Sequence, residues 1–494
     1  MAETTNNKQP VPGRLPDIEA YMQKRLGLDT SFDLGFRELV LLKKEVQIYY
    51  VTGLCDSAII QELLKLLVGI NDHESNARKL PEIIENRLIH QQVEKIETMD
   101  EAVDQILSGL IVLFINGEKR GFVIDVRHYP GRTPEEPDTE RVVRGSRDGY
   151  TENVIENTAL TRRRIRDARL RHEMLKVGER SKTDVCISYL KDVADEGLVK
   201  LVKEKIEQIE IDGITMADKA LEEFIIERKW TPYPLVRYTE RPDVAATHLL
   251  EGHVMIIVDT SPSAIILPTT FFHHLQHAEE YRQAPTIGTF IRWIRFLAVG
   301  LSMYLLPLWM LFVLQPELLP ENLAFIGPND AGNVPIAVQI ILGGIGMEFL
   351  RMAAIHTPTP LSTAMGLIAA VLIGQIAIDV GMFTPEVILY ISISAIGSYV
   401  TPSYELSVAN KLLSVSLVIL TALFGQIGLM IGIVVHLLFL INIRSLKTPY
   451  LWPFIPFNAM AFLHVLFRIP VPFTKRRPGI VHPKNNYKQS LKKS

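Results

Sequence analysis

The distribution of apolar and charged positions divides the chain near residue 291. From Met1 to about Pro285 charged residues are dense and apolar runs are short. From Ile291 to Ile443 charges nearly vanish and apolar runs reach the length of a membrane span. We therefore expect a soluble N-terminal domain of about 250 residues followed by a cluster of membrane-spanning helices.

Within the apolar region, four stretches are long enough to span a bilayer. A helix rises about 1.5 Å per residue, so about 20 residues cross a hydrocarbon core of roughly 30 Å. A shorter, polar stretch at 385–400 is expected either to re-enter or to cross. The four predicted spans are 291–314, 334–355, 361–380 and 412–443, the last counted as one long span, kinked or tilted, with Gly425, Gly428 and Gly432 as its bends.

Charges beside these spans predict their orientation. Arg292 and Arg295 begin the first span, and the 444–494 segment is basic without a single acid, so the N-terminal and C-terminal ends of the membrane domain are both predicted to lie on the cytoplasmic side. Two cytoplasmic ends require an even number of crossings. Four full spans with a re-entrant 385–400 segment satisfy this, whereas five full spans would place the tail outside. The 444–494 segment is expected to form an interfacial stretch and a basic tail.

The soluble region repeats one pattern: helix, glycine, strand, turn, strand. It occurs at 102–126, where Asn116–Gly117 is a tight-turn signal, and again at 244–270. Asp184–Leu190 is typical of a further strand, and an amphipathic helix follows it. The pattern predicts an α/β cytoplasmic domain of two similar subdomains, followed by an all-α polytopic membrane domain. The expected limits are a disordered leader at 1–30, subdomains at about 31–150 and 180–285, a basic helical segment joining them, and the membrane domain at 286–443.

Composition narrows the functional classes. The net charge is −3, and the two cysteines, Cys55 and Cys186, lie in no metal-binding or disulfide pattern, so the soluble part is predicted to be cytoplasmic. No phosphate-binding loop, dinucleotide fingerprint or nucleophile elbow is present in the sequence. We therefore expect no enzyme activity, no cofactor, no metal site and no nucleic-acid partner.

Two clusters of polar residues in the soluble region have competing interpretations. His273, His274 and His277, with glutamates nearby, could supply metal ligands, but interfacial or packing roles are the alternative. The run Thr161–His172 (TRRRIRDARLRH) could bind nucleic acid or anionic headgroups. Because acids interrupt its positive field, a solvated or subunit-contacting helix face is favoured.

Ionisable groups inside the apolar region are more informative, because a charge exposed to lipid is costly. Glu348 and Arg351 stand three residues apart on one helix face and can pair. The functional interpretation is a pore or solute path, and the alternative is a set of contacts between helices. The predicted pathway residues are Gln339, Glu348, Arg351, Gln375, Asp379, Ser392, Ser394 and Ser398; Glu405, Lys411 and His436 also lie in or beside spans.

Many segments resemble one known family, the A subunits of the GerA-type spore germinant receptors, in order and from about Phe32 to Pro453. After EFLR, where receptor A subunits continue with an acid and a basic helix end, this chain has Met352, His356 and TPTPLSTAMG, which resembles a sporulation-protein branch of the family. The matching segments are RGSRDGYTE (144–152), NTALTRRRIRD (157–167), TERPDV (239–244), LLEGHV with VDTSP (249–262), LPTTFF (267–272), EFLR (348–351), LIGQIAIDVG (372–381), TPSYELS (401–407) and PYLWP (449–453).

The resemblance implies a protein of the spore inner membrane that acts in germination, with its large domain and both termini in the spore core. It implies a homo-oligomer, expected to be a pentamer around an ion pathway for monovalent cations. Other germination membrane proteins, including a small membrane partner, and membrane lipids are the implied partners. Family-motif residues carried over by position are Arg144, Arg147, Glu152, Asn157, Arg163, Arg164, Glu240, Arg241, Pro242, Asp243, Glu251, Gly252, Asp259 and Pro402.

Two other functions stay open at this point. A secondary transporter of a small solute with a regulatory cytoplasmic domain would also use broken helices, although no paired inverted halves occur in the sequence. A non-conducting membrane scaffold would use the spans only as anchors for the α/β domain.

Overall fold

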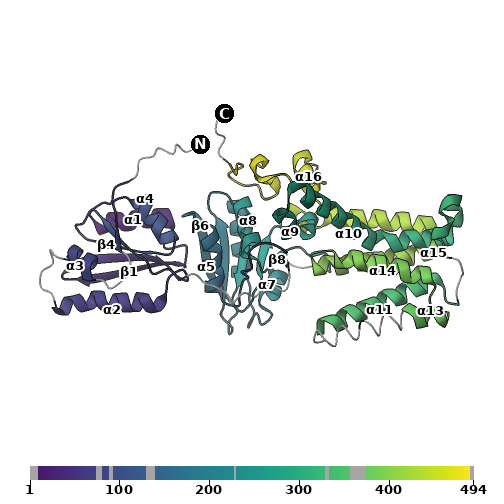
Figure 1. Ribbon diagram of the computed structural model, residues 1–494, viewed down its shortest axis with the longest axis horizontal. Helices are drawn as coiled ribbons and strands as arrows, with labels where there is room; N and C mark the ends of the chain where they lie inside the picture. Colours follow the sequence, from purple (N-terminus) through teal and green to yellow (C-terminus); the bar gives the residue numbers. More distant parts are fainter. Residues whose placement is uncertain are drawn as a thin grey trace. The chain divides into compact units, whose positions relative to one another are not determined.

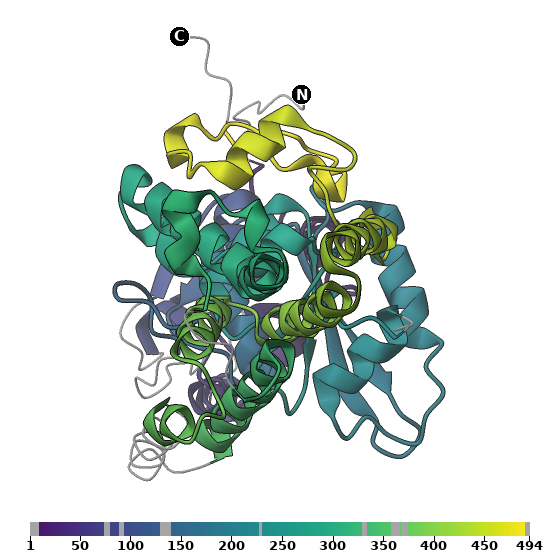
Figure 2. The same ribbon diagram turned by 90° about the vertical axis from the view of Figure 1, so that its right-hand side faces the viewer.

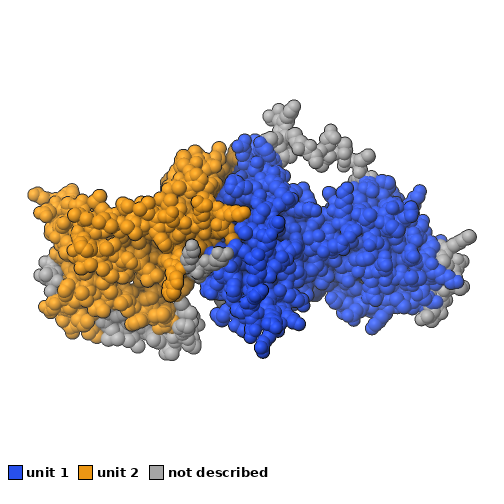
Figure 3. All heavy atoms as spheres, turned by 180° about the vertical axis from the view of Figure 1, so that it is seen from behind, with its two compact units in different colours: residues 1–228, 236–268, 474–494 blue, residues 229–235, 269–473 orange. Residues whose placement is uncertain are grey.

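The computed structural model describes residues 9–73, 80–87, 93–128, 140–226, 230–328, 333–356, 366 and 374–489 (Figure 1). The chain forms two compact units (Figure 3). Unit 1 comprises residues 1–228, 236–268 and 474–494, and unit 2 comprises 229–235 and 269–473. The chain therefore passes from one unit to the other four times, after residues 228, 235, 268 and 473.

Unit 1 contains two five-stranded antiparallel sheets with equivalent topology, which confirms the two similar α/β subdomains. The strand orders are β1-β2-β4-β5-β3 and β6-β7-β9-β10-β8, so each strand of one sheet has a counterpart in the other. The first subdomain consists of α1 (Leu15–Leu26), β1 (Leu34–Leu41), β2 (Lys44–Val51), α2 (Ser57–His73), α3 (Leu80–Arg87), β3 (Val93–Ile96), α4 (Met99–Leu107), β4 (Ile111–Ile115) and β5 (Gly121–Ile124).

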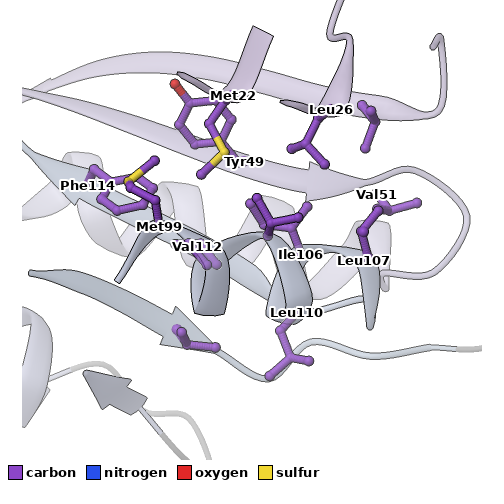
Figure 4. Packing of buried hydrophobic residues seen from close by; sticks show 14 of the residues in the cluster. Met22, Leu26, Tyr49, Val51, Met99, Ile106, Leu107, Leu110, Val112 and Phe114 are labelled. Carbon is purple, nitrogen blue, oxygen red and sulfur yellow. The ribbon is translucent and has the colours of Figure 1, made fainter. Parts of the chain in front are cut away.

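Helices cover both faces of this first sheet, which explains its continuous apolar strands. Along β4, Val112 and Phe114 face the helices α1 and α4, where Met22 and Ile106 complete the core (Figure 4). The alternate residues of the same strand belong to a second core with α2 and α3. A strand buried on both faces reads as an unbroken hydrophobic run, as β4 does.

The second subdomain begins earlier than the sequence predicted. The basic segment is helical only to Arg164, and Leu170–Val177 forms a strand that opens the second sheet. The sheet begins at residue 170 because all eight residues of this strand pair with the next strand. The elements are α5 (Val154–Arg164), β6 (Leu170–Val177), β7 (Thr183–Leu190), α6 (Glu196–Glu207), α7 (Ala217–Ile226), β8 (Arg237–Thr239), α8 (Pro242–Glu251), β9 (Val254–Val258) and β10 (Ala264–Leu267).

Unit 2 is mainly helical. Of the described helices, α10, α11 and α15 are long and apolar enough to cross a membrane. The first predicted span begins six residues earlier than expected, at Pro285, and most of the predicted span 361–380 lies outside the described residues. The elements are α9 (Ala278–Arg282), α10 (Pro285–Leu314), α11 (Ile336–His356), α13 (Ala377–Asp379), α14 (Pro385–Tyr399), α15 (Tyr404–Asn442), β11 (Arg444–Ser445), β12 (Thr448–Pro449) and α16 (Ala459–Leu466).

The prediction of one long span at 412–443 is wrong, because α15 is a helical hairpin. Gly425 has φ 58° and ψ −137°, and helical stretches lie on both sides of it. A Cβ at Gly432 would lie 2.4 Å from Leu417 Cδ2, although 15 residues of straight helix span about 22 Å. The two stretches therefore fold back on each other, side by side (Figure 2).

The 385–400 stretch forms one continuous helix, α14, rather than a re-entrant loop. Gln339 Oε1 accepts a hydrogen bond from Thr384 N, 2.8 Å away, just before α14 begins. At the other end of α14, the Arg351 guanidinium lies 5.5 Å from the centre of the Tyr399 ring. The helix α14 thus runs parallel to α11 from Gln339 to Arg351, a length of about 18 Å.

The C-terminal tail is docked on unit 1. Arg477 Nε donates to the Leu250 carbonyl at the end of α8, 2.7 Å away, and Lys488 pairs with Glu251. Ile480 and Val481 are buried. We call residues 474–489 the C-terminal strap.

Candidate functional site

Three charged side chains meet inside the helical unit, beside a row of hydroxyl groups. Glu348 of α11 accepts from Lys411 Nζ of α15 at 2.5 Å and lies 3.6 Å from Arg351 Nη1, the partner expected from the sequence. The Arg351 guanidinium also stacks on the ring of Tyr404, 4.4 Å from its centre. Two cations around one carboxylate leave this cluster with a net charge of +1, and its ion pairs join α11 to α15.

Hydroxyl groups of α10, α14 and α15 adjoin this cluster. Ser398 and Ser407 are joined by a 2.6 Å hydrogen bond between their Oγ atoms, and Arg351 Nη1 donates to Ser407 Oγ at 3.3 Å. Ser394 Oγ donates to the Ser302 carbonyl of α10, also at 3.3 Å. A small cavity of about 30 Å³ lies between α10, α11, α14 and α15, and Lys411 lines it together with these four serines.

Close backbone packing fixes the depth of these serines against α10. A Cβ at Gly397 would lie 2.3 Å from the Ala298 carbonyl oxygen, so α14 and α10 touch at their backbones beside Ser398. Small residues allow such close approach between membrane helices, and polar groups then bond across the interface. The result is a polar seam inside an otherwise apolar bundle.

The structure gathers only part of the predicted pathway set. Glu348, Arg351, Ser394 and Ser398 belong to the cluster, but the other four predicted residues do not. Gln339 is buried at the far end of α11, where Nε2 donates to the Val334 carbonyl. Ser392 is half-buried and bonds to its own helix, and Gln375 and Asp379 are exposed.

The family-motif residues of unit 1 stabilise its second subdomain. Arg241 is fully buried and donates to Asp243 and to the carbonyls of Glu140 and Ser146, which orders the 140–148 loop. Arg164 pairs with Asp148 of the same loop. Asn157 is buried and bonds to the Thr151 backbone, and Asp259 accepts a hydrogen bond from Val154 N at the start of α5. The Glu240 carbonyl accepts from Tyr150 N and the Glu152 carbonyl from Thr260 N, while Pro242 begins α8, Gly252 ends it with φ 104°, and Glu251 pairs with Lys488. Arg144, Arg147 and Arg163 are exposed, and Pro402 lies in the turn between α14 and α15.

The interpretation of the basic run as a solvated or subunit-contacting face is wrong for Arg162. Its guanidinium is fully buried and forms two hydrogen bonds with the Asp33 carboxylate, at 2.8 and 3.1 Å. Burial alone would raise the pKa of Asp33, but the Arg162 charge lowers it below its usual value. His172 is also buried, and burial lowers its pKa to about 3, so this ring is neutral. Within this run, Arg162 therefore connects the two subdomains, whereas Arg163, Arg166 and Arg169 are exposed.

The histidine cluster has packing roles. His273 Nδ1 accepts from Thr270 N, and His277 Nδ1 accepts from Glu279 N at the start of α9. Among the described residues, no group of three or more His, Cys, Asp or Glu side chains is placed to hold a metal. Glu280, which the sequence placed near the histidines, instead pairs with Arg292 at 2.7 Å and with Arg295.

Sequence reasoning missed two residues of the cluster and understated a third. Ser302 and Ser407 were not predicted, because a serine in an apolar helix is common and does not by itself indicate a site. Lys411 was noted only as lying in or beside a span. The usable signal was spacing: Ser407 and Lys411 are four residues apart and share a helix face.

Comparisons with known proteins agree with this architecture. The profile of the family described as "Bacillus/Clostridium GerA spore germination protein" matches residues 20–480. The chain is 60% identical over 471 residues to Stage V sporulation protein AF of Bacillus subtilis (strain 168), covering 95% of this chain and 96% of the relative. It is 28% identical to Spore germination protein KA of the same organism, covering 95% and 87% of the two chains.

A solved structure also resembles part of the chain. The crystal structure of the N-terminal domain of the A subunit of the Bacillus megaterium spore germinant receptor GerK3 aligns with a TM-score of 0.43 and 25% identity. The alignment covers 54% of this chain and 98% of that one.

Proposed function

Since the chain belongs to the GerA spore germination protein family, we propose that this membrane protein is a subunit of an oligomeric ion channel that promotes or amplifies ion release during germination. The proposed assembly is a homo-oligomer, a pentamer being the expected form. It acts in the spore inner membrane with both termini in the spore core, together with other germination membrane proteins and a small membrane partner. Monovalent cations are the transported ions, and the protein is not an enzyme.

The observation that carries this proposal is the charged and hydroxyl cluster inside the helical unit. Charged side chains within membrane segments are costly, and those present usually mark ion or solute pathways. Glu348 and Lys411 are the oppositely charged members, and both are only partly buried, with 25% and 27% of their side chains exposed. A carboxylate and an ammonium at such a site set the field that a passing ion meets.

The test is ion selectivity in liposomes that contain the full-length protein. Replacing Glu348→Gln removes a negative charge and is expected to shift the reversal potential toward lower cation preference. Replacing Lys411→Met removes a positive charge and is expected to shift it in the opposite direction. Ser392→Ala is the matched control, because this hydroxyl bonds only to the Ile388 carbonyl of its own helix among the described residues.

If the ion pair of Glu348 and Lys411 has a purely structural role, the two variants give a different result. Both variants then reduce the current or the amount of folded protein without opposite shifts in reversal potential. Saturable, gradient-coupled uptake would identify a secondary transporter, and a folded oligomer without current would identify a scaffold. Unchanged selectivity in Glu348→Gln combined with alanine at Ser394 and Ser398 contradicts the assigned pathway.

A further inference from the structure

The cavity between α10, α11, α14 and α15 is lined mainly by apolar surface, but five polar side chains also reach it. Four serine side chains and the Lys411 ammonium line it, with Leu306, Met347 and Ile391 among the apolar residues. Its volume of about 30 Å³ is enough for one or two water molecules, because one water needs about 10–15 Å³ of such space. The chemistry of its lining decides what can occupy it.

All four serine hydroxyl protons are already donated to protein acceptors. Ser302 donates to the Val299 carbonyl, and Ser394 donates to the Ser302 carbonyl. Ser407 donates to the Ser398 carbonyl at 2.9 Å, so the proton in the bond between their hydroxyls comes from Ser398. The serines therefore offer oxygen lone pairs to the cavity. The ammonium of Lys411 has three N–H groups, and only one has a partner among the described residues, Glu348.

The polar stripe of α15 continues past the cavity. Ser407, Asn410, Lys411 and Ser414 occupy one face of the helix, at the spacing i, i+3, i+4 and i+7. Asn410 is fully buried, and neither atom of its amide group has a hydrogen-bond partner within the described chain. The Ser414 hydroxyl is also buried, and among described residues it likewise has none. Buried polar groups of native proteins are nearly always satisfied, by protein or by ordered water.

We propose that this seam is a buried hydration site, in which ordered water bridges the Lys411 ammonium, the serine oxygens and the amide of Asn410. A cation is disfavoured as the resident occupant because the neighbouring charges sum to +1, which does not bar the passage of an ion. An anion is disfavoured because the four serines that line the cavity present only oxygen lone pairs to it. Water both accepts from the ammonium and donates to the serine lone pairs, so it satisfies each group.

This site gives the ion pair of Glu348 and Lys411 a solvent inside the bundle. Water keeps both groups charged where the surrounding residues are apolar, since an unsolvated charge in such surroundings would neutralise. The hydration site stands whether or not the protein conducts ions, because it concerns the folded bundle of a single chain.

The first test is the sign of a stability change in the full-length protein in lipid nanodiscs. Replacing Asn410→Leu conserves side-chain size and removes the amide. If the site is dry, Leu replaces an unsatisfied amide and the thermal midpoint rises. If water bridges the amide to its neighbours, the midpoint falls by several degrees. Asn442→Leu is the matched control at an exposed position of the same helix, and it is expected to leave the midpoint nearly unchanged.

The second test detects the water directly and does not depend on the first variant folding. In a background with Cys55→Ala and Cys186→Ala, the rate at which methyl methanethiosulfonate modifies Ser414→Cys is compared with that of Ala409→Cys. Ala409 is equally buried but apolar, with 1% of its surface exposed. Thiols ionise and react only where water reaches them. At least tenfold faster modification at position 414 is expected, whereas equal rates, or a higher midpoint for Asn410→Leu, overturn the proposal.

Discussion

Replacing Asp33→Asn tests how the two subdomains of unit 1 are joined. Asp33 lies directly before β1 and receives two hydrogen bonds from Arg162 of α5. The side chains of Asp33 and Arg162 are 1% and 0% exposed. The substitution conserves shape but removes the negative charge, and arginine cannot release its proton to compensate. A buried positive charge is left without its counter-charge.

The expected cost follows from that burial. Breaking a buried ion pair by changing one partner costs about 3–5 kcal/mol, and each 1.4 kcal/mol changes an equilibrium roughly tenfold. Local opening of the second subdomain is therefore expected to become roughly 10²- to 10⁴-fold more frequent. The double variant Asp33→Asn/Arg162→Met removes both charges and is expected to recover part of the loss.

Cysteine labelling measures this opening without detergent. The chain has two cysteines, both in unit 1, and Cys186 of β7 is fully buried. In a Cys55→Ala background, the maleimide labelling rate of Cys186 in lipid reports the population of the open form when closing is faster than labelling. Asp33→Asn should accelerate this labelling by the same factor as the opening.

A control on the surface separates the buried pair from general loss of charge. Arg180 and Asp212 are 3.4 Å apart, with side chains 83% and 73% exposed. Such a pair contributes less than about 1 kcal/mol, so Asp212→Asn should change the labelling rate by less than about fivefold. Equal rates in the Asp33→Asn and Asp212→Asn variants would refute the reasoning.

Three further variants test other features. Gly425→Ala should destabilise unit 2 by about 1–3 kcal/mol, because the backbone conformation of residue 425 is strained for alanine. Tryptophan fluorescence measures the loss of stability. Gly300→Ala is the control and should be nearly neutral, because a Cβ at residue 300 meets open space. Burial lowers the pKa of His172 to about 3, so between pH 6.5 and pH 3 only the unfolded chain takes up a proton at this residue. The free energy of unfolding therefore falls by about 1.4 kcal/mol for each unit by which the pH is lowered. His172→Gln should reduce this slope, measured by urea unfolding followed by proteolysis. Arg477→Ala should release the C-terminal strap, seen as faster tryptic cleavage beyond Ile480 than in Lys475→Ala, where the changed side chain is exposed.

The strands and helices of unit 1 were predictable because their signals are local. The run Leu110–Ile115, the Asn116–Gly117 turn and the strand after it occupy adjacent positions, and the structure places β4 and β5 there. Gly117 has φ 92°, the conformation that such a turn requires. Hydrophobic periodicity and turn chemistry act over a few residues, so the sequence alone reveals them.

Distant contacts were beyond that reach. The partner of Arg162 lies 129 residues away, and a run of arginines reads as a solvated surface until that partner is known. The pair of Glu348 and Arg351 was predictable from one helical turn, whereas the closer partner, Lys411, lies 63 residues further along. Length alone also made α15 one span, because the apolar pattern of a hairpin resembles that of a single long helix.

The C-terminal strap has a consequence for the order of synthesis. Residues 474–494 complete unit 1, yet they leave the ribosome after every helix of unit 2 has been made. Until then, the end of α8 lacks the hydrogen bond from Arg477, and the surfaces that bury Ile480 and Val481 stay uncovered. Unit 1 is therefore finished only once the C-terminal strap has been translated, and a chain truncated before it carries an unfinished surface by which it differs from a chain that has the strap.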